Sequence, residues 1–128
     1  MVSMATYYFV SSLQPTVSAQ IAGAISVPID LCVTSPSEAA RATAATAKNG
    51  HWVFTVDEPL LASRERHESV SDVMARYAQA LRVIAAYDTR AALVVCDELD
   101  MLGPAVVTLD DQGILQAADA IERRLPLP

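Results

Sequence analysis

The sequence is short of basic residues and of long apolar runs, and each shortage excludes a class of protein. Nine lysines and arginines face fifteen aspartates and glutamates, which gives a formal charge of −6. The chain therefore lacks the broad basic surface with which proteins bind the phosphates of nucleic acids. No window approaches the roughly 18 consecutive apolar residues of a membrane span, and the N-terminus lacks the features of a signal peptide. We expect a cytoplasmic protein with neither nucleic-acid nor membrane partners.

Cysteine is also scarce, because the chain contains only Cys32 and Cys96. Each belongs to an apolar run of strand-like character, which favours two buried free thiols in the core over a disulfide or a reactive thiol. A chain of 128 residues that is 52% hydrophobic can bury a core without disulfides or structural metal. We expect one domain that covers residues 1–128.

Five short apolar runs predict β-strands, and most of them are continuous, as is typical of strands buried on both faces. They are Thr6–Val10, Leu31–Val33, Trp52–Val56, Ala91–Cys96 and Ala105–Leu109. Helical segments separate most of these runs, which predicts a three-layer α/β/α sandwich with a mostly parallel sheet. The eight residues from Asp97 to Pro104 are fewer than the roughly 10 to 12 of a parallel crossover. The fifth strand is therefore expected to be an antiparallel edge.

Three helices are expected between and after these strands. One opens at Ser35-Pro36-Ser37-Glu38, with Ser35 as the N-cap, and stops at Asn49-Gly50. Another spans about Asp111 to Leu125, with acidic residues at its start and arginines at its end. The clearest helix carries an apolar stripe of helical period. The stripe consists of Val70, Val73, Met74, Tyr77, Leu81, Ile84 and Ala85.

Polar residues follow three of the predicted strands, at the edge where open α/β sheets bind ligands. The first strand ends in Ser11-Ser12, the second in Thr34-Ser35 and the fourth in Asp97-Glu98. These residues have a second interpretation, because serines and acids also cap helices and turns. A metal site from Asp97, Glu98 and Asp100 has the oxygen ligands of hard cations but no loop signature, and we expect neither metal nor cofactor.

Four segments in order resemble the histidine phosphatase superfamily, the phosphoglycerate mutase-like proteins. Thr34-Ser35-Pro36 with its alanine-rich continuation resembles the family's "Ser-Ser-Pro, Arg, Ala, any, any, Thr-Ala" signature. The other three are Tyr7–Leu13 at the first strand and its Arg-His-Gly motif, Glu68–Arg76 at the start of the long helix, and Leu93–Asp97 at the "Val-Val-Ser-His" strand. The resemblance covers residues 5–102 and implies a phosphoglycerate mutase-like fold.

The positions that carry the family's chemistry depart from its pattern. Ser11 stands where the resemblance places the first arginine, and Ser12 replaces the nucleophilic histidine. Ala39 stands at the second arginine and Asp97 at the second histidine, while the acidic proton donor falls near Ser63 or Glu65 without a clear match. A phosphate dianion beside Asp97 with no arginine opposite would be repelled, which predicts a pseudoenzyme.

Three functions are compatible with this sequence. The first is a non-catalytic domain that binds a small molecule or a protein partner at the strand ends. The second is a repurposed enzyme in which Asp97 or Glu98, with a raised pKa, serves as general acid or base beside Ser11 and Ser12. The third is a structural subunit, as a homodimer or as the partner of an active relative.

The expected ligand-binding residues combine the strand ends with one polar loop. They are Ser11, Ser12, Ser35, Arg64, Arg66 and Asp97, with Asp97, Glu98 and Ser12 as the catalytic candidates. The pocket is expected to prefer neutral or cationic ligands. Arg64 or Arg66 would restore anion binding if the loop from Ser63 to Ser69 folded over the opening.

Overall fold

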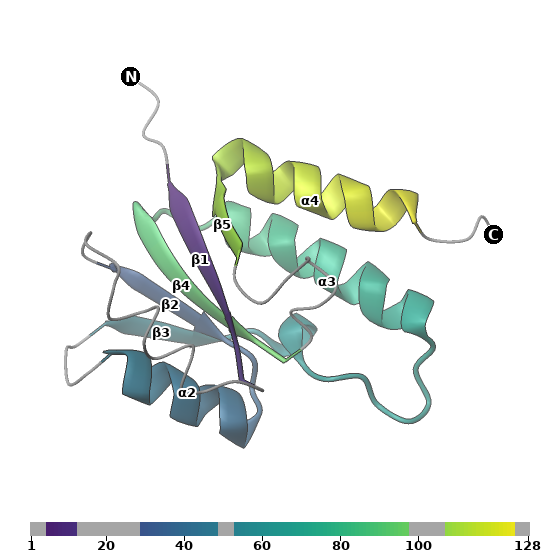
Figure 1. Cartoon of the computed structure of the whole chain (residues 1–128), viewed down its shortest axis with the longest axis horizontal. Coiled ribbons are helices and arrows are strands. Elements are labelled where there is room, and N and C mark those ends of the chain that lie inside the picture. The colour runs from purple at the N-terminus through teal and green to yellow at the C-terminus, as the bar shows by residue number, and fades with distance from the viewer. Residues whose placement is uncertain (1–4, 13–28, 49–52, 98–106, 125–128) are drawn as a thin grey trace.

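Five β-strands form one mixed sheet in the computed structural model, which describes residues 5–12, 29–48, 53–97 and 107–124 (Figure 1). The strands are β1 (Thr6–Ser11), β2 (Leu31–Thr34), β3 (Phe54–Asp57), β4 (Ala91–Cys96) and β5 (Val107–Asp110). Their order is β3-β2-β4-β1-β5, and all neighbours are parallel except β5, which runs antiparallel to β1. The prediction of an α/β fold with an antiparallel edge strand is confirmed.

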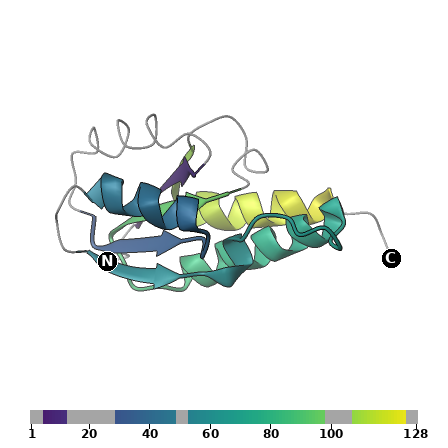
Figure 2. The same cartoon turned by 90° about the horizontal axis from the view of Figure 1, so that it is seen from below.

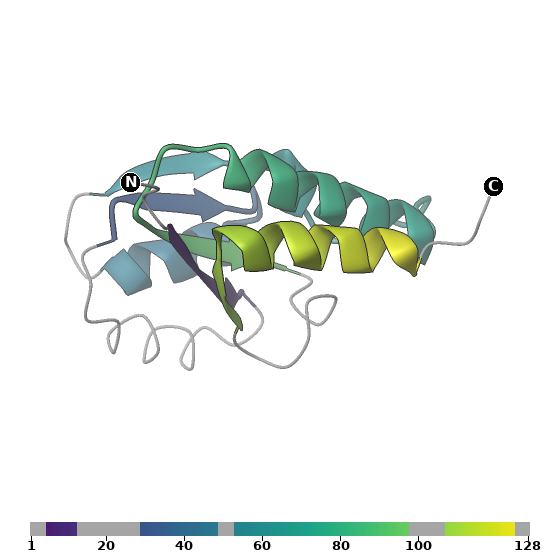
Figure 3. The ribbon, with the colours of Figure 1, turned by 90° about the horizontal axis from the view of Figure 1, so that it is seen from above.

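The described helices are α2 (Glu38–Lys48), the short 3₁₀ helix η1 (Pro59–Leu61), α3 (Val70–Ala85) and α4 (Asp111–Arg123). Helix α2 lies on the opposite side of the sheet from α3 and α4 (Figures 1 and 2). Helices α3 and α4 run side by side (Figure 3), and Arg82 of α3 donates hydrogen bonds to Asp119, at 2.6 Å, and to Glu122. In the described ranges, no helix is both long enough and apolar enough to span a membrane.

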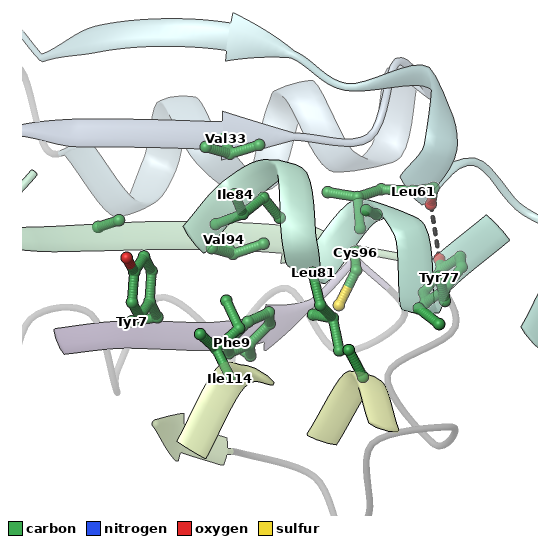
Figure 4. Close-up of a cluster of buried hydrophobic side chains, with 14 of the residues drawn as sticks. Tyr7, Phe9, Val33, Leu61, Tyr77, Leu81, Ile84, Val94, Cys96 and Ile114 are labelled. Atoms are coloured by element: carbon green, nitrogen blue, oxygen red, sulfur yellow. Dashed lines mark hydrogen bonds between the residues drawn. The ribbon is translucent and has the colours of Figure 1, made fainter. Parts of the chain in front are cut away.

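Alternate residues of the central strands supply two separate hydrophobic clusters, one on each face of the sheet. Tyr7 and Phe9 of β1 pack with α3 and α4, as Figure 4 shows, and Tyr77 of α3 donates a 2.6 Å hydrogen bond to the Leu61 carbonyl there. Val10 belongs to the cluster beside α2. Both faces of β2 and β4 are buried because helices cover both, which explains why these strands are continuous apolar runs, whereas the edge strand β3 is mostly exposed.

Both cysteines are buried free thiols, which confirms their prediction as core residues. Cys96 belongs to the cluster beneath α3 and α4, whereas Cys32 packs beside α2. The sheet therefore separates the two thiols.

The prediction of Ser35 as the N-cap of the first helix is wrong. Helix α2 begins at Glu38, and its N-cap is Ser37, whose Oγ accepts a hydrogen bond from the Ala40 amide at 3.1 Å. Ser35 hydrogen-bonds a carboxylate instead of capping the helix. In the apolar stripe of α3, Val70 is 52% exposed, because it is the first residue of a helix that extends past the sheet (Figure 1). The predicted stop at Asn49-Gly50 lies outside the described residues.

Candidate functional site

The sheet order brings three strand ends together at one point. Strand β4 lies between β1 and β2, so the residue that follows β4 is flanked by the residues that follow its two neighbours. The Ser12 amide donates to the Cys96 carbonyl at 3.0 Å, and the Ser35 amide donates to the Val95 carbonyl at 2.8 Å. These backbone hydrogen bonds fix Ser12 and Ser35 on either side of Asp97.

Asp97 accepts hydrogen bonds from four serine hydroxyls. Its Oδ1 atom accepts from Ser12 and, at 3.0 Å, from Ser37. Its Oδ2 atom accepts from Ser35 at 2.7 Å and from Ser63 at 3.0 Å. A carboxylate has about four acceptor positions, so this arrangement fills them. We call these five residues the Asp97 cluster.

The environment of Asp97 keeps its carboxylate ionised although the residue is only 4% exposed. Burial raises the pKa of Asp97, but the four serine hydroxyls stabilise the charged form and together lower the pKa below its usual value. The sequence-based expectation of a raised pKa at this strand end is therefore wrong for Asp97. It rested on burial alone, whereas the hydrogen-bond donors decide the direction of the shift.

Sequence reasoning identified three members of the cluster and missed two. Ser37 was assigned only to the start of a helix, and its hydroxyl in fact serves both as the N-cap of α2 and as a donor to Asp97. Ser63 lies in an exposed polar loop far along the chain from the strand ends. Its sequence signals are a position after the turn that follows β3 and a place near the acidic proton donor of the family resemblance, and neither indicated a contact with Asp97.

The loop that carries Ser63 is held in place by Arg76 of α3. The Arg76 guanidinium donates to the backbone carbonyls of Leu60 and Ala62 at 3.0 and 2.9 Å, and to that of Ser63 at 3.3 Å. It also forms a two-pronged ion pair with Glu68, at 2.8 and 2.7 Å. All five N–H donors of the guanidinium are thereby used. Hydrogen bonds from Arg76 lower the pKa of Glu68 to about 2.

The remaining predicted residues lie outside the cluster. Ser11 is buried at the end of β1, one residue before Ser12, and is not among the donors to Asp97. Arg64 and Arg66 are exposed on the loop, and Arg64 donates from Nε to the Glu68 carbonyl at 2.8 Å. Neither arginine forms an ion pair with Asp97 in the described part of the chain. Glu98 lies outside the described residues.

The chain was compared with known proteins at the level of sequence. No protein-family model matches it, and no curated protein matches it either. The function is therefore argued from the Asp97 cluster itself.

The first prediction concerns the contribution of Asp97 to stability. Asp97→Asn should lower the free energy of unfolding by about 1–3 kcal/mol at neutral pH, because an amide cannot accept four hydroxyl donors. The matched control is Asp57→Asn, which removes an exposed ion pair with Arg41 and should cost at most about 1 kcal/mol. Urea unfolding of the three proteins measures both effects.

The pH dependence gives the same prediction a second readout. The folded-state pKa of Asp97 is lowered, so its contribution is present above the ordinary aspartate pKa and is lost as the pH falls through the folded value. The stability difference between wild type and Asp97→Asn should therefore shrink below about pH 4. A difference that stays constant down to about pH 2 would contradict an ionised Asp97.

The second prediction concerns Arg76. Arg76→Lys should destabilise the fold by about 1–3 kcal/mol, because an ammonium group cannot replace five donors in a planar fork. It should also increase amide hydrogen exchange in residues 60–68. Arg82→Lys, on the same helix but in a more exposed ion-pair network, should cost at most about 1 kcal/mol. Equal effects of the two substitutions would show that Arg76 does not hold the loop.

Proposed function

We propose that this chain is a catalytically degenerate, histidine-phosphatase-like domain that binds a small molecule or a protein partner at the carboxyl ends of its strands. In this proposal, the three-layer arrangement is that of the phosphoglycerate mutase-like proteins. The order of strands and helices supports it, as do the antiparallel edge strand and the helices on both sides of the sheet.

The observation that carries the proposal is which residues stand at the strand-end site. Four positions at which the resemblance expects arginine or histidine hold Ser11, Ser12, Ala39 and Asp97. The buried Asp97 carboxylate takes the hydroxyl donors of the site for itself. A phosphate dianion would meet a like charge in a poorly solvated place, and within the described residues no guanidinium forms an ion pair with Asp97 to offset the repulsion.

The same geometry favours binding over acid–base catalysis. A general base needs a free acceptor position and a pKa near the working pH, and Asp97 has neither. Ser12 donates its proton to a carboxylate of lowered pKa, which is a weak base for activating a nucleophile. The cluster therefore lacks the pairing of nucleophile and base that a repurposed hydrolase would require.

One segment of the family resemblance has a structural explanation that involves no chemistry. Ser69 and Asp72 form a capping box at the start of α3, with reciprocal hydrogen bonds of 3.1 and 3.0 Å. Glu68 and Arg76 clamp the preceding loop. These residues stabilise the start of α3 and the loop before it. A binding domain requires this scaffold even where its catalytic residues are replaced.

The third prediction is that the purified protein does not hydrolyse an aryl phosphate such as p-nitrophenyl phosphate, or phosphohistidine, above the buffer background. Ser12→Ala should leave this background unchanged, because Ser12 is not a nucleophile in this account. The measurement is product release over a range of pH. Activity that copurifies with the chain and disappears in Ser12→Ala would refute the proposed function.

A further inference from the structure

Two of the carboxylates at the carboxyl edge of the sheet differ in how their negative charge is balanced. Asp57 ends β3, and its Oδ2 accepts a hydrogen bond from Arg41 Nη2 at 2.6 Å in an exposed ion pair. Asp97 follows β4, is almost fully buried, and takes its hydrogen bonds from neutral hydroxyls. Hydroxyl dipoles stabilise the negative charge of Asp97, but they do not neutralise it.

The arginines whose side chains the structure describes do not supply the missing positive charge. There are eight arginines and one lysine, and the side chains of all eight arginines lie within the described ranges. In those ranges, no arginine forms an ion pair with Asp97. Lys48 is the last residue of α2, about 15 Å along the helix axis from the first turn, which lies beside Asp97. Asp97 is thus a buried anion that has no ion-pair partner among the described arginines.

The hydroxyls around Asp97 can offer only acceptor positions to a ligand. A serine has one hydroxyl proton, and each of the four serines donates it to Asp97. The oxygens of Ser35 and Ser37 also accept backbone N–H groups, at 3.4 and 3.1 Å. The hydroxyl groups of Ser12 and Ser63 make no second hydrogen bond within the described residues, and Ser63 is exposed. Ser63 is thus the exposed member of the Asp97 cluster, and its side chain contacts the buried carboxylate directly.

We propose that the Asp97 cluster binds the primary ammonium group of a small molecule, which donates an N–H bond to the hydroxyl oxygen of the exposed residue Ser63 and places its positive charge toward Asp97. The inference rests on the proposed function, in which this edge of the sheet serves binding and not catalysis. A primary ammonium has both required properties, N–H donors and a positive charge. An alcohol lacks the charge, a quaternary ammonium lacks the N–H donors, and a phosphate has the opposite charge.

The test is an NMR titration of the full chain with three probes of similar size at constant ionic strength: n-butylammonium, 1-butanol and butyltrimethylammonium. The amide signals of Ser12, Ser63 and Asp97 should shift and saturate with n-butylammonium. Its affinity should exceed that of the other two probes by about tenfold, the loss expected without a charge-assisted hydrogen bond.

Three variants separate the contributions to binding. Asp97→Asn removes the charge, and Ser63→Ala removes the exposed acceptor from a loop position where truncation leaves the core intact. Each should weaken n-butylammonium binding by about tenfold. Asp57→Asn, which removes the strand-end carboxylate that has its own arginine, should leave the affinity unchanged.

Each remaining outcome overturns the inference in a distinguishable way. Equal shifts with butyltrimethylammonium would indicate diffuse attraction to an acidic surface, and no saturable shift with n-butylammonium would refute the ligand class. Both results leave the proposed function standing if the chain still lacks phosphatase activity. Saturable shifts with inorganic phosphate, and none with the amine, would contradict the inference and the proposed function together.

Discussion

A single buried carboxylate holds five parts of this chain together. Asp97 follows β4, and its four hydrogen bonds reach the end of β1, the end of β2, the first turn of α2 and the loop before α3 through Ser12, Ser35, Ser37 and Ser63. Hydroxyls are weaker donors than guanidinium groups, but four of them acting on one anion in a poorly solvated place stabilise its charged form. The geometry of the strand-end site therefore depends on Asp97 remaining ionised.

The polar groups around this site form two layers. Asp97 and its serines make the inner layer, and Arg76 with Glu68 makes an outer layer that fixes the loop on which Ser63 lies. Tyr77 reinforces the outer layer by donating to the Leu61 carbonyl from within the core. Because α3 supplies both Arg76 and Tyr77, packing of α3 against the sheet also positions the loop that borders the site.

The sequence predicted the parts of this structure that depend on local pattern. Continuous apolar runs located all five strands to within two residues at each end, and the short link after β4 predicted the antiparallel direction of β5. The rule that ligands bind at strand carboxyl ends also predicted correctly that Ser12, Ser35 and Asp97 lie close together. These inferences need only periodicity, loop length and the geometry of parallel sheets.

The errors have a common physical origin in contacts between distant parts of the chain. Ser63 and Asp97 are 34 residues apart, so their hydrogen bond has no local sequence signature. The local sequence predicts Ser35 as the N-cap of α2. The hydroxyl of Ser35 bonds Asp97 instead, and this contact depends on where β4 ends, which the local sequence does not show. The predicted direction of the Asp97 pKa shift was wrong for the same reason. An apolar strand indicates burial, but the sequence does not show that four serine hydroxyls converge on the carboxylate.

The most direct test of this account is the pKa of Asp97, followed by the side-chain carboxyl carbon signal in an NMR titration of the folded protein. The account predicts a midpoint below the ordinary aspartate value, and a higher midpoint in Ser63→Ala, where one of the four donors is lost. A midpoint at or above the ordinary value would show that burial outweighs the hydroxyls. The cluster would then be a neutral hydrogen-bond network, and the argument for an anionic strand-end site would fail.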